Sequence, residues 1–387
     1  MVATVIGALV VLLAAANFFP ASSNLFTLAG AYVWASSAPH LVLVSLVAAL
    51  LIIPLWRTKR RAVLRGIASG TVVLALGAST VISGSLIAAA TSNGGSVNLV
   101  QAVTLSTPTK PATEITSYVT VGGEPLEARV YEPKGGAAGA PVMMYIHGGG
   151  WQTGSAEESE STVQHWAAQG WYVVSVNYRL SSTQQATWDK APADVACALA
   201  WTGRHATEAG ADIDRLTVMG DSAGGHLAVL LGWSAGAGTA ASSCPELGET
   251  PVPDAVVAGY PAIDVQYNYD NGVAPVAGID PQEFTHLFLG GTPSQFPDRL
   301  RAVSPLTYLG EATPSTLVLQ PERDDFIPAE GNYRSIETAA QAGVDATIIR
   351  VPFAWHAFDA FQGGLGGQVK NTVTRNWLEQ RDLAPRQ

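Results

Sequence analysis

One stretch of the sequence joins an apolar run, a serine between glycines and a second apolar run without interruption. Residues 216–219 suit a buried strand, Gly220-Asp221-Ser222-Ala223-Gly224 follows, and residues 227–231 are apolar throughout. This order predicts a strand, a sharp turn and a helix. The residue at the apex of such a turn has a strained backbone, and the glycines on either side remove Cβ atoms that would collide there. Ser222 is therefore expected at a helix N-terminus, where free N–H groups favour developing negative charge.

A second glycine-rich turn precedes this one in the chain. Residues 141–146 are typical of another buried strand, and they lead directly into His147-Gly148-Gly149-Gly150-Trp151. Three consecutive glycines lose much conformational entropy on folding and leave their backbone N–H groups uncovered by side chains. A loop of this kind suits an oxyanion hole, in which backbone N–H groups stabilise a negatively charged oxygen.

The two motifs, in this order, resemble the α/β-hydrolase superfamily and, more narrowly, the hormone-sensitive-lipase-like esterases and related carboxylesterases. The resemblance extends over residues 115 to 385 or so. It implies an α/β-hydrolase fold with a mostly parallel eight-stranded sheet, helices on both faces and a small cap insert. It also implies that the backbone N–H groups of Gly149, Gly150 and Ala223 form the oxyanion hole and that no cofactor takes part.

The charges divide the chain into two parts. No Asp or Glu precedes Glu114, whereas six of the 21 Lys and Arg residues do, so all 31 acidic residues lie from that position onward. An acidic body argues against nucleic acid as a partner, because phosphate binding requires a basic face. Charged residues make up only 13% of the chain, which is low for a wholly soluble protein and favours a membrane segment.

Three apolar stretches near the N-terminus predict transmembrane helices, at residues 2–19, 41–56 and 66–90. The first two are separated by residues 20–37, whose aromatic side chains suit a membrane interface. The basic residues between 57 and 65 are expected to stay in the cytoplasm. This orientation would place everything after about residue 91 on the outer face of the membrane, as a multi-pass protein with an extracytoplasmic catalytic domain.

We therefore expect a three-helix membrane anchor at 1–90, a linker at 91–113 and a catalytic domain at 114–387. The linker is rich in Ser, Gly, Thr, Asn and Pro and has no clear periodicity, as flexible connections do. Cleavage near Ala88-Ala89-Ala90 would free the catalytic domain, and the sequence leaves that alternative open.

The catalytic domain alternates strand and helix patterns, which predicts a doubly wound sheet with its ligand site beyond the carboxyl ends of the strands. Residues 114–121 and 126–131 alternate apolar and polar residues around Gly122-Gly123, as in a hairpin. Further strands are expected at 141–146, 171–178, 215–219, 254–260, 314–320 and 346–351, and helices at 157–169, 188–209, 328–342 and 368–379.

An irregular segment at about 264–301 lies where this fold inserts its cap. It contains five aromatic residues, Tyr267, Tyr269, Phe284, Phe288 and Phe296. They either line an acyl or alcohol pocket or pack the cap onto the core. The sequence does not distinguish the two.

A serine hydroxyl needs a base within hydrogen-bond reach and a carboxylate that orients this base. In this fold the order along the chain is Ser, Asp or Glu, then His. Two histidines follow the helix after Ser222, namely His286 and His356. His356 comes shortly after the last predicted strand, where the family has its base, whereas His286 lies in the cap insert. We expect His356 to be the base.

The catalytic acid is expected in the loop after the strand at 314–320. The family pattern, an Asp three residues before a Val or Ile that is followed by Pro, selects Asp324, with Asp325 and Glu322 as alternatives. Gln320-Pro321 stands where His-Gly is frequent in the family, which puts the loop geometry in doubt.

The sequence shows no metal site and contains two cysteines. No His, Cys or Asp cluster has the spacing of metal ligands. Cys197 and Cys244 are the two cysteines. They could form a disulfide outside the membrane, or Cys197 could be a buried free thiol in its apolar helix.

The sequence thus predicts a membrane-tethered carboxylesterase or lipase that cleaves short to medium acyl esters, with a small-molecule or lipid-like ester as substrate. An acyltransferase, a cell-envelope deacetylase or a peptidase on the same fold is the alternative. A third possibility is a non-catalytic binding domain on a membrane anchor.

Overall fold

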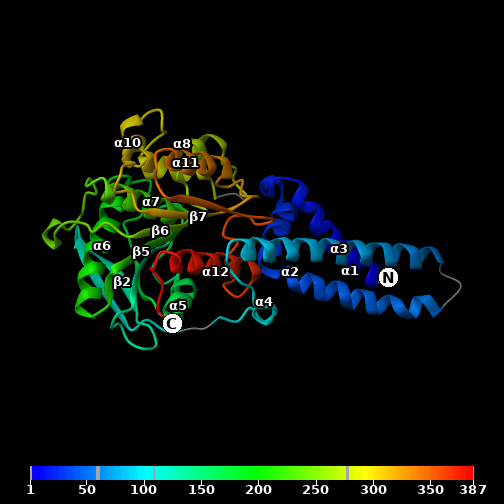
Figure 1. Ribbon diagram of the computed structural model, residues 1–387. Helices are drawn as coiled ribbons and strands as arrows, with labels where there is room; N and C mark the ends of the chain where they lie inside the picture. Colours follow the sequence, from blue (N-terminus) through cyan, green and yellow to red (C-terminus); the bar gives the residue numbers. More distant parts are fainter. Residues whose placement is uncertain (1, 58–61, 108–109, 276–278, 387) are drawn as a thin grey trace.

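The computed structural model describes residues 2–57, 62–107, 110–275 and 279–386. Figure 1 shows a layered α/β part and a bundle of N-terminal helices that projects from one side of it. Lys59, Arg60 and Arg61, which contribute to the predicted basic loop, lie outside the described residues.

The α/β part is built on one eight-stranded sheet in the order β1-β2-β4-β3-β5-β6-β7-β8. The first two strands pair antiparallel, as does β2 with β4, and the other neighbours are parallel. The predicted eight-stranded, mostly parallel sheet is confirmed. The strands are β1 (Glu114–Val121), β2 (Glu124–Tyr131), β3 (Pro141–Ile146), β4 (Tyr172–Val176), β5 (Asp212–Asp221), β6 (Ala255–Gly259), β7 (Ser315–Pro321) and β8 (Ala346–Val351).

Helices cover both faces of the sheet because alternate strand residues point to opposite sides. On one face, Val142 and Met144 of β3 pack with α6 (Lys190–Glu208), α7 (Ala223–Gly236) and α11 (Ala329–Gln341). On the other, Met143 and Tyr145 pack with α5 (Glu160–Ala168) and α12 (Leu365–Glu379). The central strands are buried on both faces, which explains their continuous apolar runs.

The prediction of three membrane spans is wrong in number. Two helices, α2 (Leu25–Ile52) and α3 (Ala62–Ser92), are long and apolar enough to cross a membrane, judged by length and composition. The first helix, α1 (Val2–Ala15), has 14 residues. It is about 21 Å long at 1.5 Å per residue, whereas a hydrocarbon core is about 30 Å thick.

The second span also begins earlier than predicted, because residues 25–37 are helical rather than an interfacial loop. Asn24 caps α2: its side chain accepts the N–H groups of Phe26 and Thr27, and the Thr27 hydroxyl accepts the N–H of Asn24. Trp34, expected at a membrane interface, is fully buried and donates its indole N–H to the Leu13 carbonyl at 3.0 Å. A Cβ on Gly30 of α2 would lie 3.1 Å from the Leu13 carbonyl oxygen of α1, so a residue without a side chain here allows the two helices to pack closely.

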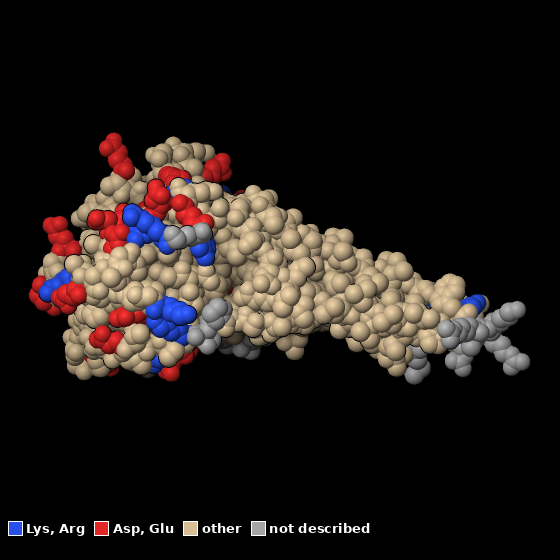
Figure 2. Space-filling model, turned by 60° about the horizontal axis from the view of Figure 1, so that its bottom comes forward, with Lys and Arg blue, Asp and Glu red and all other residues tan. Residues whose placement is uncertain are grey.

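The N-terminal helices are packed against the catalytic part. Ala35 and Ala38 of α2 and Leu86 of α3 belong to the same buried apolar cluster as Val369 and Val373 of α12. Figure 2 shows charged side chains gathered on the catalytic part, while the described residues of the helical part show almost none on this face.

The stretch expected to be a flexible linker is also fixed to α12 where it is described. The backbone N–H of Ser96 donates to the Thr372 hydroxyl at 3.0 Å, and that of Asn98 to the Gln368 side chain at 2.6 Å. A Cβ on Gly95 would lie 2.6 Å from the Thr372 hydroxyl, so only glycine permits this approach. A short helix, α4 (Leu99–Thr104), follows.

A disulfide joins Cys197 of α6 to Cys244, with the Cα atoms 5.3 Å apart and a sequence separation of 47. Of the two alternatives that the sequence left open, the structure has the disulfide. It ties α6 to the segment that leads into β6.

The cap lies between β6 and β7, where the sequence predicted an insert. It consists of α8 (Val265–Asn271), α9 (Pro281–Leu289), α10 (Pro297–Ala302) and the 3₁₀ turn η6 (Pro305–Tyr308). Asp264 and Asp280 cap α8 and α9 through their side chains.

Candidate active site

Ser222 lies at the sharp turn between β5 and α7, with φ 56° and ψ −122°. A Cβ on Gly220 would lie 2.3 Å from the Gly224 carbonyl oxygen, and one on Gly224 would lie 2.2 Å from that of Ile146. Both positions therefore require glycine, as the pentapeptide indicated. The turn holds the Ser222 side chain beyond the carboxyl end of the central strand.

A continuous line of hydrogen bonds runs from Ser222 through His356 to Asp324. His356 Nε2 lies 3.0 Å from Ser222 Oγ, and His356 Nδ1 lies 2.8 Å from Asp324 Oδ2. The three side chains come from the turn after β5, the loop after β8 and the loop after β7. The structure thus brings together the three residues that the sequence selected, from positions 134 and 32 residues apart.

The Asp324 side chain is fully buried, and its other oxygen accepts the backbone N–H of Ile327 at 2.9 Å. Burial raises the pKa of Asp324, against the lowering effect of His356. The alternative acids lie elsewhere: Glu322 is exposed, and Asp325 accepts hydrogen bonds from Ser22 and Trp355. The alternative base, His286, is exposed on α9 of the cap.

The triglycine loop lies beside Ser222 in a conformation that only glycine adopts readily. Gly149 has φ 115° and Gly150 has φ 59°. His147 supports the loop from below: its ring stacks on Tyr178 with centroids 4.4 Å apart, and its Nδ1 donates to the Gly148 carbonyl at 2.7 Å. Burial lowers the pKa of His147 to about 4. This histidine is therefore neutral at neutral pH and holds the loop in shape.

A cavity of about 600 Å³ opens over Ser222 and His356. Phe284 of the cap and Phe326 line it, whereas Phe288 is fully buried and stacks on Trp151 with ring centroids 4.5 Å apart. The sequence left open whether the aromatic residues of the cap line a pocket or pack the cap onto the core. The structure shows both roles: Phe284 lines the pocket, and Phe288 packs the cap onto the core.

Sequence reasoning missed a buried charged cluster beneath the turn. Lys370 of α12 is fully buried and lies 2.5 Å from both Asp221 and Asp359. Tyr145 donates to Asp221 at 2.5 Å, and Tyr260 donates to Asp359 at 2.7 Å. Despite burial, the two carboxylates keep the pKa of Lys370 above its usual value.

The cluster reaches the candidate base, since the Tyr260 ring packs edge-on against His356 with centroids 4.7 Å apart. Nothing in the local pattern of α12 distinguishes Lys370 from a solvated lysine. The burial of Lys370 follows from the assembled fold, in which α12 packs beneath the turn after β5. Among the described residues, no group of three or more His, Cys, Asp and Glu could hold a metal ion.

The sequence is similar to a known protein family and to known esterases. A protein-family model described as BD-FAE matches residues 129–335. Esterase LipC of Mycobacterium tuberculosis is 29% identical over 236 residues, which cover 60% of this chain and 57% of LipC. The probable carboxylic ester hydrolase LipM of the same organism is 29% identical over 237 residues, or 57% of this chain and 50% of LipM. The chain thus spans about half the length of the curated relatives it matches.

A solved structure shares the fold. The propionate-bound form of Est2, a thermophilic esterase from Thermogutta terrifontis, superposes with a TM-score of 0.58 at 22% identity, covering 72% of this chain and 97% of Est2. The family model extends from β2 to α11 and includes both glycine-rich turns and Asp324. The chain therefore belongs to the BD-FAE family and has the α/β-hydrolase fold.

Proposed function

We propose that this protein is a serine hydrolase of the carboxylesterase type, with Ser222 as nucleophile, His356 as base and Asp324 as the carboxylate that orients His356. The hydrogen-bonded line through these three residues carries the proposal. The esterase names of LipC and Est2 support the same activity.

The reaction proceeds in two steps. His356 Nε2 takes the proton of Ser222 as the hydroxyl attacks the ester carbonyl, and Asp324 stabilises the imidazolium that forms. The backbone N–H groups of Gly149, Gly150 and Ala223 stabilise the oxyanion. The proton then passes to the leaving alcohol. Water attacks the acyl-enzyme by the same route and releases the acid.

Short to medium acyl esters are the proposed substrates. The cap is small, and Phe284 lies so close over Gly150 that a Cβ there would be 2.3 Å from its ring. The pocket on this side of Ser222, lined by Gly150, Ala223 and Phe284, has a volume of only about 10 Å³, which favours a short acyl chain. The propionate in the Est2 structure supports the same range.

We further propose that α2 and α3 cross a membrane and that the catalytic domain lies outside the cytoplasm. Large apolar side chains on these helices are exposed, including Leu46, Val47 and Leu50 of α2 and Val73 and Leu74 of α3. In the sequence, basic residues lie between the two helices. The C-terminal end of α2 and the N-terminal end of α3 lie at the end of the bundle far from the sheet (Figure 1), and the positive-inside rule favours a cytoplasmic location for that end. The disulfide supports an oxidising compartment for the catalytic domain.

Hydrolysis of p-nitrophenyl esters with acyl chains of increasing length tests the activity. The full-length protein in detergent is expected to prefer acetate or butyrate over long chains. Ser222→Ala is expected to lower kcat by about 10⁴-fold or more, whereas Ser294→Ala, at an exposed position in the cap, keeps the wild-type rate. Wild-type inactivity over the whole acyl series would contradict the proposal.

A further inference from the structure

The exposed apolar side chains of α2 and α3 form a belt that ends before the helices reach the catalytic part. On α2, none of residues 33–42 is exposed, whereas residues 43–47 include four exposed Leu and Val side chains. On α3, the exposed large apolar side chains lie between positions 63 and 81, a length of helix of about 27 Å. A hydrocarbon core is about 30 Å thick, so the belt has the height of a membrane interior.

The short helix α4 lies beside α2 where this belt ends. His40, one turn before the first exposed residue of the belt, donates from Nε2 to the Val103 carbonyl of α4 at 2.8 Å. Ala102 of α4 is fully buried and belongs to the same apolar cluster as Ala35 and Ala38 of α2. Figure 1 shows α4 next to the point where the bundle leaves the catalytic part. The helix is therefore level with the edge of the belt.

The apolar side chains of α4 are exposed rather than buried. Leu99 is 57% exposed and Val103 is 38% exposed, and residues four apart lie on the same side of a helix. Val100, three residues before Val103, is 73% exposed. We call these three side chains the α4 surface. The sequence has no charged residue between Arg65 and Lys110, so the α4 surface is flanked by uncharged chain. Exposed apolar side chains that gather in this way mark interaction sites.

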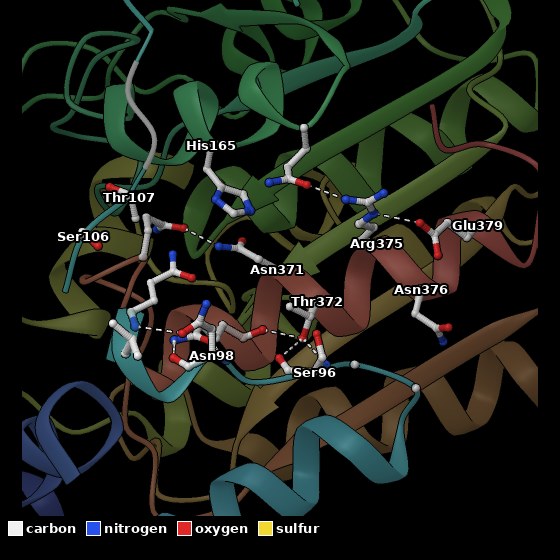
Figure 3. Close-up of a pocket in the computed structure, with 17 residues that line it drawn as sticks. Ser96, Asn98, Ser106, Thr107, His165, Asn371, Thr372, Arg375, Asn376 and Glu379 are labelled. Atoms are coloured by element: carbon white, nitrogen blue, oxygen red, sulfur yellow. Dashed lines mark hydrogen bonds and ion pairs between the residues drawn. The ribbon is translucent and has the colours of Figure 1, made fainter. Parts of the chain in front are cut away.

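Hydrogen bonds fix α4 to the catalytic part. The Gln368 side chain of α12 accepts the backbone N–H of Asn98 at 2.6 Å and donates to the Asn98 carbonyl at 3.1 Å. Asn98 in turn caps α4, since its side chain accepts the N–H of Gln101 at 3.1 Å. Figure 3 shows Ser96 and Asn98 beside Thr372 of α12. The α4 surface is therefore carried by a backbone that is bound to α12.

We propose that the α4 surface lies in the outer leaflet of the membrane that α2 and α3 cross, and that it holds the catalytic part against the lipid. This contact rests on the proposed membrane spans and is independent of the proposed esterase activity. Continuity carries the assignment, because the exposed side chains of α2 begin one turn beyond His40, to which α4 is bonded. Apolar side chains of interfacial helices are buried by about 5–10 Å at the boundary of headgroups and acyl chains. Since the segment has no charge, the contact does not require anionic lipid.

Site-directed spin labelling of the full-length protein in phosphatidylcholine vesicles tests this contact. Cys197 and Cys244 form a disulfide and are the two cysteines of the chain, so one introduced cysteine gives one free thiol. Leu99→Cys places the nitroxide on the α4 surface, and Val73→Cys places it in the belt on α3. Val252→Cys is the control, at an exposed position just before β6. Power-saturation EPR compares collisions with oxygen, which concentrates in lipid, and with a water-soluble nickel chelate.

The Leu99 label is expected about 5–10 Å inside the membrane, the Val73 label deeper and the Val252 label in water. Adding phosphatidylglycerol should leave the depth of the Leu99 label unchanged. A Leu99 label as accessible to nickel as the Val252 label, with the Val73 label in lipid, overturns the contact and leaves the spans standing. A Leu99 label shielded from both reagents also overturns it, because protein such as a second copy would then cover α4. A Val73 label in water refutes the spans and the contact with them, whereas a protein that cleaves no ester but gives the expected depths refutes only the esterase function.

Discussion

Asp325 accepts two hydrogen bonds from Ser22, at 2.9 Å from the backbone nitrogen and 2.6 Å from Oγ, across 303 residues of sequence. Its other oxygen accepts the indole N–H of Trp355 at 2.7 Å. Asp325 follows the candidate acid, and Trp355 precedes the candidate base. The connection between α1 and α2 is therefore bound directly to the loop after β7 and, through Asp325, to the loop after β8.

Removing the Ser22 hydroxyl should impair hydrolysis from outside the active-site cavity. A hydrogen bond to a charged acceptor contributes about 1.5–3 kcal/mol, and small displacements of catalytic groups are costly. We expect Ser22→Ala to lower kcat on p-nitrophenyl butyrate on the order of tenfold with little change in KM. Ser23→Ala, at the exposed neighbouring position, is the matched control. Equal rates in both variants would show that this contact does not position the loops.

The two neighbouring aspartates should differ sharply in their effect on the reaction. Asp324→Asn is expected to lower kcat by about 10⁴-fold, because it removes the carboxylate that fixes and stabilises His356. Asp325→Asn should reduce kcat far less, since Asp325 only supports the loops. Steady-state kinetics of both variants on one ester measure the two losses in kcat. A greater loss in Asp325→Asn than in Asp324→Asn would mean that Asp325, not Asp324, is the catalytic acid.

Lys370→Met should destabilise the protein strongly. It leaves Asp221 and Asp359 as buried carboxylates without a cation, and breaking a buried ion pair in this way costs about 3–5 kcal/mol. Thermal unfolding of the full-length protein in detergent measures the loss. Lys190→Met serves as control, because its ion pair with Asp189 is partly exposed and contributes about 0–1 kcal/mol. A melting temperature for Lys370→Met within the range of the control would contradict the account.

Acid should destabilise the fold through its buried neutral histidines. Burial lowers the pKa values of His147, His165 and His226 to about 4, below the unfolded value of about 6.5. Between these values the unfolded chain binds more protons, so stability falls as pH falls from 6.5 towards 4.

His165 is the histidine to replace in a test of this dependence, because its Nδ1 has no partner among the described residues. The loss of stability between pH 7 and pH 5 should be smaller in His165→Gln by on the order of 1–2 kcal/mol. Thermal unfolding at both pH values measures it. An unchanged pH dependence in the variant would mean that His165 is charged in the folded protein.

Removing the disulfide should lower stability without touching the site. Cys197→Ala with Cys244→Ala opens a loop that the bond closes over 47 residues, and such a loss typically costs about 2–4 kcal/mol. The melting temperature of the double variant should match that of the reduced wild-type protein. Wild-type stability that is insensitive to reductant would argue against the bond.

The sequence predicted the catalytic part well because its signals are local. Period-two and continuous apolar runs located all eight strands, and the steric need for Gly220 and Gly224 marked the turn at Ser222. The order Ser, Asp, His then selected residues that the fold brings within hydrogen-bond distance.

The parts that sequence reasoning missed depend on contacts between distant segments. A uniformly apolar stretch gives no sign of where one helix ends, so the start of α2 at Leu25 was overlooked although Asn24 is a strong N-cap residue. The packing of residues 94–98 on α12 and the burial of Lys370 arise only when the sheet is assembled. The local sequence pattern therefore predicts neither this packing nor the burial of Lys370.

Labelling with a fluorophosphonate, followed by mass-spectrometric identification of the modified residue, tests the central claim most directly. Ser222 is expected to carry the label in the wild-type protein, with labelling and p-nitrophenyl butyrate hydrolysis both abolished in Ser222→Ala and nearly so in His356→Ala. Ester hydrolysis that persists in Ser222→Ala, or a label on another serine, would contradict the account.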